Sequence, residues 1–110
     1  MVSGITRLKA DVNSGALSVD FAARQVKVSG LEIRLTPTEY SLLRVLVQNA
    51  GKVVTHRQLL RTVWGEKAES QAQYLRVYVT HLRKKLETRE NAPRLIKTEV
   101  GIGYRLSTEP

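Results

Sequence analysis

Polar and apolar residues alternate along the first third of the chain. Alternation with a period of two is typical of strands with one buried face, and it covers residues 16–20, 25–28 and 31–35, with a weaker run near residues 9–13. Ser29 and Gly30 separate two of these runs and suit a two-residue hairpin turn. The pattern predicts a small antiparallel sheet with one apolar face.

At Thr36 the period changes to that of an α-helix. Thr36, Pro37 and Glu39 supply an N-cap, a proline in the first turn and the acidic partner of a capping box. Gly51 is the type of residue that often follows the end of a helix. We expect a first helix between them, with buried positions at Tyr40, Leu42, Leu43, Leu46, Val47 and Ala50.

A second, shorter helix is expected from Thr55. Thr55 and Gln58 have the spacing of another capping box, and Gly65 is the expected end. Val53 and Val54 precede it; they are too few to stand alone but suit an edge strand of another hairpin. The apolar positions of this helix are Leu59, Leu60, Val63 and Trp64, and we expect Trp64 to plug the core.

Residues 70–87 predict a third helix with two unlike faces, separated from the second helix by a polar turn at 66–69. Ser70 begins a third capping-box pattern. One face is an apolar stripe of Leu75, Val79, Leu82 and Leu86. The opposite face presents Gln73, Val77, Thr80 and Lys84, flanked by Arg76 and His81. Because this face has no acid before Glu87, we favour contact with a DNA major groove over an ordinary solvated face.

The end of the chain returns to a strand pattern after a loop at 88–93. Residues 94–98 and 104–106 predict a hairpin, with two glycines in its connection. The hairpin can close the core, serve as a DNA-binding wing, or do both. We expect Ile96, Ile102 and Tyr104 to point inward, and the residues near a phosphate or minor groove to be Lys97 and Thr98.

The order of elements predicts an α+β fold. It is a winged helix-turn-helix with an N-terminal antiparallel β-sheet, three helices and a C-terminal β-hairpin wing. We expect one domain over residues 10–107, with a lead-in at 1–9 and a tail at 108–110, because 110 residues suffice for one compact domain.

Positive charge is concentrated in the second half of the chain. Residues 1–51 carry six Lys/Arg and four Asp/Glu, a balance of +2, whereas residues 52–105 carry twelve and five, a balance of +7; with Glu109 the net charge is +8. Clustered cations favour a polyanionic partner. Arg83, Lys84 and Lys85 form a basic run in which Lys84 points with Thr80, Arg83 sits to one side and Lys85 lies at the core edge. A carboxylate inside the domain is an alternative partner for Arg83.

Several classes of function find no support in the sequence. There is no cysteine, which excludes disulfides and thiol catalysis. His56 and His81 pair with no nucleophile or carboxylate, so we expect neither enzyme activity nor a metal or cofactor. No segment resembles a signal peptide or a transmembrane helix, so a cytoplasmic protein without membrane contact is expected. Tyr74 and Tyr78 are expected to pack on the helix flank.

Three segments together resemble one family. They are LTPTEYSLLRVLVQNAGKVVTHRQLLRTVWG from Leu35, YLRVYVTHLRKKLE from Tyr74 and IKTEVGIGYRL from Ile96. In this order they resemble the C-terminal effector domain of OmpR/PhoB-type response regulators, over residues 16–106. The second segment is most similar to the branch that controls the Kdp potassium-transport operon.

The resemblance implies a domain that controls transcription by binding double-stranded DNA at direct repeats as a head-to-tail dimer. In full-length members a receiver domain, phosphorylated by a sensor kinase, precedes it. Family contacts to DNA fall here on Gln73, Arg76, Val77, Thr80, His81, Arg83 and Lys84, and in the wing on Thr98 and Val100. A loop that touches RNA polymerase in several members falls on Glu66, Lys67, Ala68 and Glu69.

The chain departs from other members at three contact positions. Several members have Arg where this chain has Val100, so no ionic minor-groove contact is expected there. Many have Asp in place of Arg76 and Arg in place of Thr80, so a different base preference is expected. The matched segments include no receiver domain, so we expect an excised effector domain or an unregulated relative.

Two other functions remain open from the sequence alone. A winged helix can bind a protein partner through the same helix, and a basic surface argues only mildly against this. RNA binding is less favoured, because no aromatic base-stacking platform is expected on the surface.

Overall fold

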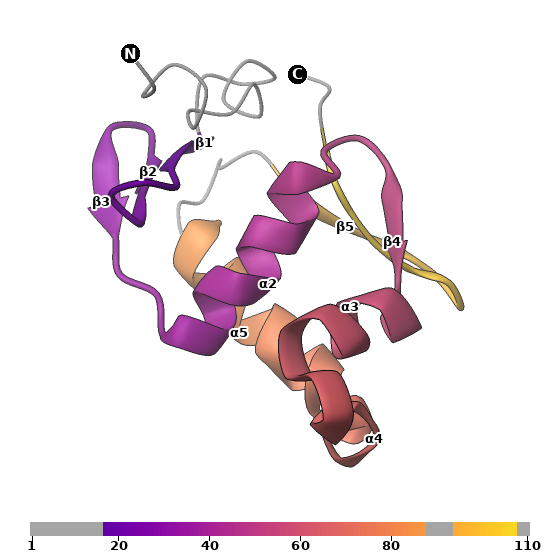
Figure 1. Ribbon diagram of the computed structural model, residues 1–110. Helices are drawn as coiled ribbons and strands as arrows, with labels where there is room; N and C mark the ends of the chain where they lie inside the picture. Colours follow the sequence, from indigo (N-terminus) through magenta and orange to yellow (C-terminus); the bar gives the residue numbers. More distant parts are fainter. Residues whose placement is uncertain (1–16, 88–93, 108–110) are drawn as a thin grey trace.

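Two small antiparallel sheets flank a layer of helices. The computed structural model describes residues 17–87 and 94–107. In Figure 1 the first sheet lies at the left, the second at the right, and helices α2 (Pro37–Gln48) and α5 (Leu75–Leu86) run between them. This is the expected α+β order of sheet, helices and hairpin. The predicted lead-in, the strand near 9–13, the loop at 88–93 and the tail lie outside the described residues.

The first sheet has the predicted hairpin at its centre. Its strands are β1 (Leu17–Asp20), β2 (Gln25–Val28) and β3 (Leu31–Ile33), paired in that order. Ser29 and Gly30 have φ angles of 53° and 85°, the two positive values that a type I′ turn requires. β3 is shorter than the predicted run to Leu35, because its pairing with β2 ends at Ile33.

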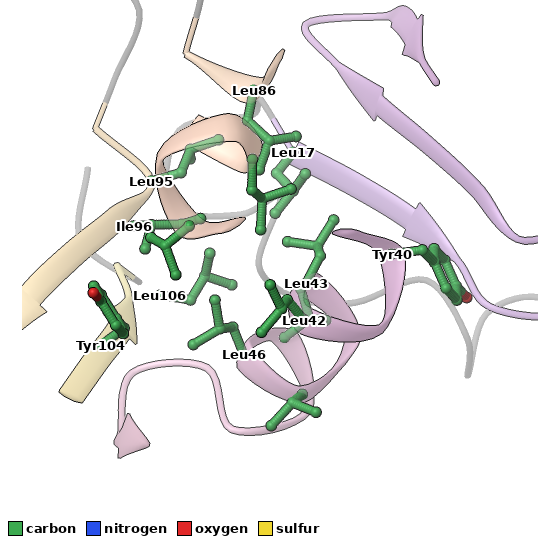
Figure 2. Packing of buried hydrophobic residues seen from close by; sticks show 14 of the residues in the cluster. Leu17, Tyr40, Leu42, Leu43, Leu46, Leu86, Leu95, Ile96, Tyr104 and Leu106 are labelled. Atoms are coloured by element: carbon green, nitrogen blue, oxygen red, sulfur yellow. The ribbon is translucent and has the colours of Figure 1, made fainter. Parts of the chain in front are cut away.

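Helix α2 begins with the predicted capping box. The hydroxyl of Thr36 accepts a hydrogen bond from the amide of Glu39 at 3.2 Å, and the Glu39 carboxylate accepts one from the Thr36 amide at 2.9 Å. The helix buries Leu42, Leu43 and Leu46 completely. Figure 2 shows these leucines inside the labelled cluster, with Tyr40 and Tyr104 at opposite ends. α2 therefore forms the middle of the core.

The second sheet joins two distant parts of the chain. β4 (Val53–Thr55) pairs with β6 (Gly103–Leu106), which pairs in turn with β5 (Ile96–Glu99). Val53 and Val54 thus form the expected edge strand. A Cβ atom on Gly103 would overlap the carbonyl oxygen of Val54, so only glycine allows this approach of the strands. The sheet ties the hairpin to the start of α3 (His56–Trp64).

The third helix begins later than predicted. Residues 65–74 form three short pieces, η2 (Gly65–Lys67), α4 (Ala68–Gln71) and η3 (Ala72–Tyr74), and α5 starts at Leu75. The polar turn at 66–69 and the capping box at Ser70 were wrong, since the Ser70 hydroxyl donates instead to the Lys67 carbonyl at 2.8 Å. Residues 66–73 include the helix formers Glu, Lys, Ala and Gln and no proline, so their composition does not mark the break before α5.

The helices of the described segments are short relative to a bilayer. None of them combines the length and apolar character that a membrane span requires.

Candidate nucleic-acid interface

Helix α5 has one buried face and one exposed face. Its apolar stripe is buried, as predicted. Leu75, Val79, Leu82 and Leu86 are each at most 3% exposed. We call the exposed residues on the opposite side the outward face of α5, and they are Arg76, Val77, Thr80, His81 and Lys84. Gln73 is also exposed but belongs to η3, which the structure separates from α5.

The outward face makes few contacts with the rest of the domain. The Thr80 hydroxyl donates to the carbonyl of Arg76, one turn earlier, at 2.8 Å. Across residues 17–87 and 94–107, Lys84 has no ion-pair partner. The helix holds four Lys/Arg residues and no Asp or Glu. The face therefore offers cations, a hydroxyl and a half-exposed valine to an external ligand.

Arg83 instead binds the hairpin. Its Nε and Nη2 atoms donate to the Ile96 carbonyl at 3.1 and 2.9 Å, and Nη2 also donates to the Thr98 hydroxyl at 2.6 Å. Its guanidinium carbon lies 5.6 Å from the ring centroid of Tyr104. The acceptors of Arg83 are a carbonyl and a hydroxyl, so the alternative of an internal carboxylate partner was wrong. Two predicted DNA contacts, Arg83 and Thr98, are thus each other's partners.

Lys85 lies on the side of α5 that faces α2, and it binds Glu39 there. Its amine lies 2.6 Å from the Glu39 carboxylate, which is 6% exposed. Burial raises the pKa of Glu39, but the hydrogen bond from Lys85, those from Thr36 and the charge of Lys85 outweigh it and hold this pKa below its ordinary value. The contact fixes the start of α2 against the end of α5. The sequence gives the capping box but no sign of this ion pair, because 46 residues separate its members.

The remaining flank of α5 packs on α3. The rings of Tyr78 and Trp64 are tilted to each other with centroids 5.1 Å apart. The Tyr78 hydroxyl lies 3.4 Å from the Gln71 side-chain oxygen. Trp64 is half-buried and covers the end of the core, whereas Tyr74 is 47% exposed. Packing was expected for both tyrosines, and the structure assigns it to Tyr78.

The hairpin stands beside α5 as an exposed wing. Lys97 is exposed, but the neighbouring Arg105 is paired with Glu99 at 3.0 Å. This ion pair was not predicted, although the hairpin register makes the two residues diagonal neighbours. Ile102 was expected to point inward and is 54% exposed. It belongs to a tight turn in which its amide donates to the Glu99 carbonyl, so strand alternation does not apply there. Val100 is 89% exposed.

The connection between α3 and α5 forms a second exposed region. Glu66, Lys67 and Glu69 are exposed, and Ala68 is half-buried. They belong to η2 and α4, which project at the lower end of the molecule in Figure 1. A surface hollow lies between this connection and α3, lined by residues that include His56, Arg57, Leu60 and Arg61.

The two histidines lie in different surroundings. His56 lies edge-on to the Tyr104 ring at a centroid distance of 5.5 Å, and His81 belongs to the outward face. Among the residues that the structure describes, no group of three His, Cys, Asp or Glu side chains is close enough to hold a metal ion.

Comparison with known proteins places this geometry in a family. Residues 30–106 match the family model described as transcriptional regulatory protein, C terminal. The chain is 53% identical over 89 residues to the KDP operon transcriptional regulatory protein KdpE of Escherichia coli K12, covering 81% of this chain and 40% of that protein. The chain thus spans about two fifths of the length of this curated relative.

Two solved structures share the fold. One is the response regulator DrrB, an OmpR/PhoB homolog of Thermotoga maritima, with a TM-score of 0.75, 35% identity and coverage of 86% of this chain and 42% of that one. The other is the Klebsiella pneumoniae RstA DNA-binding domain in complex with the RstA box, with a TM-score of 0.75, 28% identity and coverage of 86% and 94%. The chain belongs to the OmpR/PhoB-type family of winged-helix C-terminal domains of transcriptional regulatory proteins.

Proposed function

We propose that the domain binds duplex DNA sequence-specifically by placing α5 in the major groove, and that it thereby controls transcription. One observation carries the proposal: the outward face of α5 is exposed, cationic and without an acid. An α-helix fits the major groove, and cations beside it neutralise phosphates. The RstA domain, which shares the fold, was solved in complex with the RstA box.

The residues divide by chemistry into two kinds of contact. Arg76 and Lys84 suit phosphates, as does Lys97 on the wing, because each is an exposed cation. Gln73, Val77, Thr80 and His81 suit base edges. Arg83 and Thr98 hold the wing against α5, so we assign them first to the placement of the wing and only second to DNA.

We place the domain in a longer protein of the two-component type. Response regulators of this kind join a receiver domain, phosphorylated by a sensor kinase, to the DNA-binding domain. The identity to KdpE supports a role at potassium-transport genes. Two domains bound head-to-tail at direct repeats would follow the family. The exposed connection at Glu66, Lys67, Ala68 and Glu69 is our candidate contact with RNA polymerase.

Fluorescence anisotropy of labelled duplexes at several salt concentrations tests the proposal. We expect the logarithm of the binding constant to fall linearly with the logarithm of salt, since bound cations displace counterions. Lys84→Ala should lower the slope by about one unit. Lys27→Ala is the matched control, since Lys27 is also an exposed lysine but lies on β2 of the first sheet and not on α5. A slope near zero for the unaltered domain would contradict phosphate contact.

A protein partner is the second candidate, favoured by the exposed aliphatic side chains of Val100 and Ile102 at the wing. One double variant separates DNA binding by α5 from protein binding by the wing. Val100→Ser with Ile102→Ser would abolish a protein contact through the wing and leave the salt-dependent binding by α5 in place.

A further inference from the structure

The hydroxyl of Thr80 is occupied within the helix, and this limits what the residue can do at a base edge. It donates to the Arg76 carbonyl at 2.8 Å. A hydroxyl has one hydrogen, so Thr80 cannot donate to a base while this bond is kept. What Thr80 presents to an external ligand is its methyl group and the remaining acceptor capacity of the oxygen.

Val77 lies beside Thr80 and has only methyl groups to offer. It is 46% exposed and lies three residues before Thr80 on the outward face. Side chains three apart on a helix are neighbours, about 5 to 6 Å apart at Cβ. The centre of the outward face is therefore a pair of methyl-bearing side chains, bordered by the cations Arg76 and Lys84.

In a major groove, the group that matches such a pair is the 5-methyl of thymine, since the other base edges present donors and acceptors. We propose that Val77 and Thr80 form a methyl-reading pair that selects neighbouring thymines in the bound site. The proposal rests on the proposed function and names the base that α5 reads. Arg76 and Lys84 hold the pair in the groove through phosphates, whatever the sequence.

Replacement of thymine by deoxyuridine tests the pair, because it removes only the methyl group. A bound site is first selected from a random duplex library, and each of its thymines is then replaced singly. We expect a loss of affinity of about three- to fivefold at one or two neighbouring thymines, as for a buried methyl group. Replacement outside the selected site should change nothing.

Two matched variants separate the methyl from the hydroxyl. Thr80→Ser keeps the hydroxyl and removes the methyl, so sensitivity to deoxyuridine should vanish at one position. Thr80→Val keeps a methyl and removes the hydroxyl, so the sensitivity should remain. Val77→Ala should remove the sensitivity at the neighbouring thymine. Lys84→Ala should weaken every duplex by the same factor and leave the ratio of thymine to deoxyuridine intact.

The outcomes distinguish this inference from the function on which it rests. A domain that selects a site but tolerates deoxyuridine throughout it would overturn the methyl pair and leave sequence-specific binding in place. So would a Thr80→Val variant that loses the site while Thr80→Ser keeps it, because the hydroxyl would then be the reading group. A domain that selects no duplex would overturn the proposed function and the methyl pair together.

Discussion

The outward face of α5 and the two flanks of the same helix both carry Lys and Arg, but these cations differ in what they bind. The flank residues each bind another element: Tyr78 packs on α3, Arg83 binds β5 and Lys85 binds α2. Within the part of the chain that the structure describes, no hydrogen bond or ion pair joins a side chain of the outward face to another element. A cation at a flank thus stabilises the fold, whereas a cation on the outward face remains available to a ligand.

The largest effect on stability is expected at the Glu39–Lys85 ion pair, because the Glu39 side chain is buried. Glu39→Ala removes the carboxylate that accepts from the Thr36 amide in the capping box and that pairs with Lys85, so we expect a loss of about 2 to 3 kcal/mol in the free energy of unfolding. Urea denaturation measures it. Glu32→Ala, at an exposed glutamate of β3, is the control and should stay within about 0.5 kcal/mol of the unaltered domain. Equal stabilities for the two variants would mean that the Lys85 flank is not structural.

Arg83 and Arg76 sharpen the comparison between flank and outward face, since both are arginines on α5. Arg83→Ala leaves the Ile96 carbonyl and the Thr98 hydroxyl without their donor, and we expect a loss of about 1 to 2 kcal/mol in stability. Arg76→Ala should leave stability unchanged and weaken DNA binding. Thermal unfolding and anisotropy on the same samples separate the two. If Arg83→Ala unfolds like the unaltered domain yet loses DNA, Arg83 belongs with the outward face.

Lys84 and Lys85 are sequence neighbours on opposite sides of this division. Lys84→Ala should weaken binding to every duplex alike, lower the salt slope by about one unit and leave stability unchanged, because it removes one phosphate contact. Lys85→Ala should instead lower stability and leave the salt slope of binding unchanged. If Lys84→Ala lowered stability and Lys85→Ala lowered the salt slope, the assignment of the two helix faces would be reversed.

The smallest effect is a pH dependence carried by Glu39. Its pKa is lowered in the folded domain, so its contribution to stability is present above the ordinary value of about 4.3 and is lost as the pH falls through the folded pKa. Unfolding measured between pH 6 and pH 3 should show this loss. Glu39→Gln retains a capping acceptor without the charge, so its stability should fall less over the same window. Parallel curves would exclude the ion pair as the cause.

Much of the fold followed from local rules. The Thr36 capping box, the Ser29 and Gly30 turn and the buried stripe of α5 depend on contacts within a few residues, and all three are confirmed. The start of α5 was predicted wrongly because residues 66–73 are mostly good helix formers, so no residue type marks the breaks at Gln71 and Tyr74, where ψ is −4° and −6°. Ile102 was misplaced because a tight turn interrupts the alternation on which the prediction relied.

By itself the sequence determined which side of α5 is buried and that its other side is basic, because helical periodicity and charge are properties of neighbouring residues. Only the tertiary structure decided which of the basic residues are occupied. Arg83 meets Ile96 and Thr98, and Lys85 meets Glu39, across separations that no periodicity records. Ion pairs and hydrogen bonds depend on distance in space, and the fold alone brings these groups within reach.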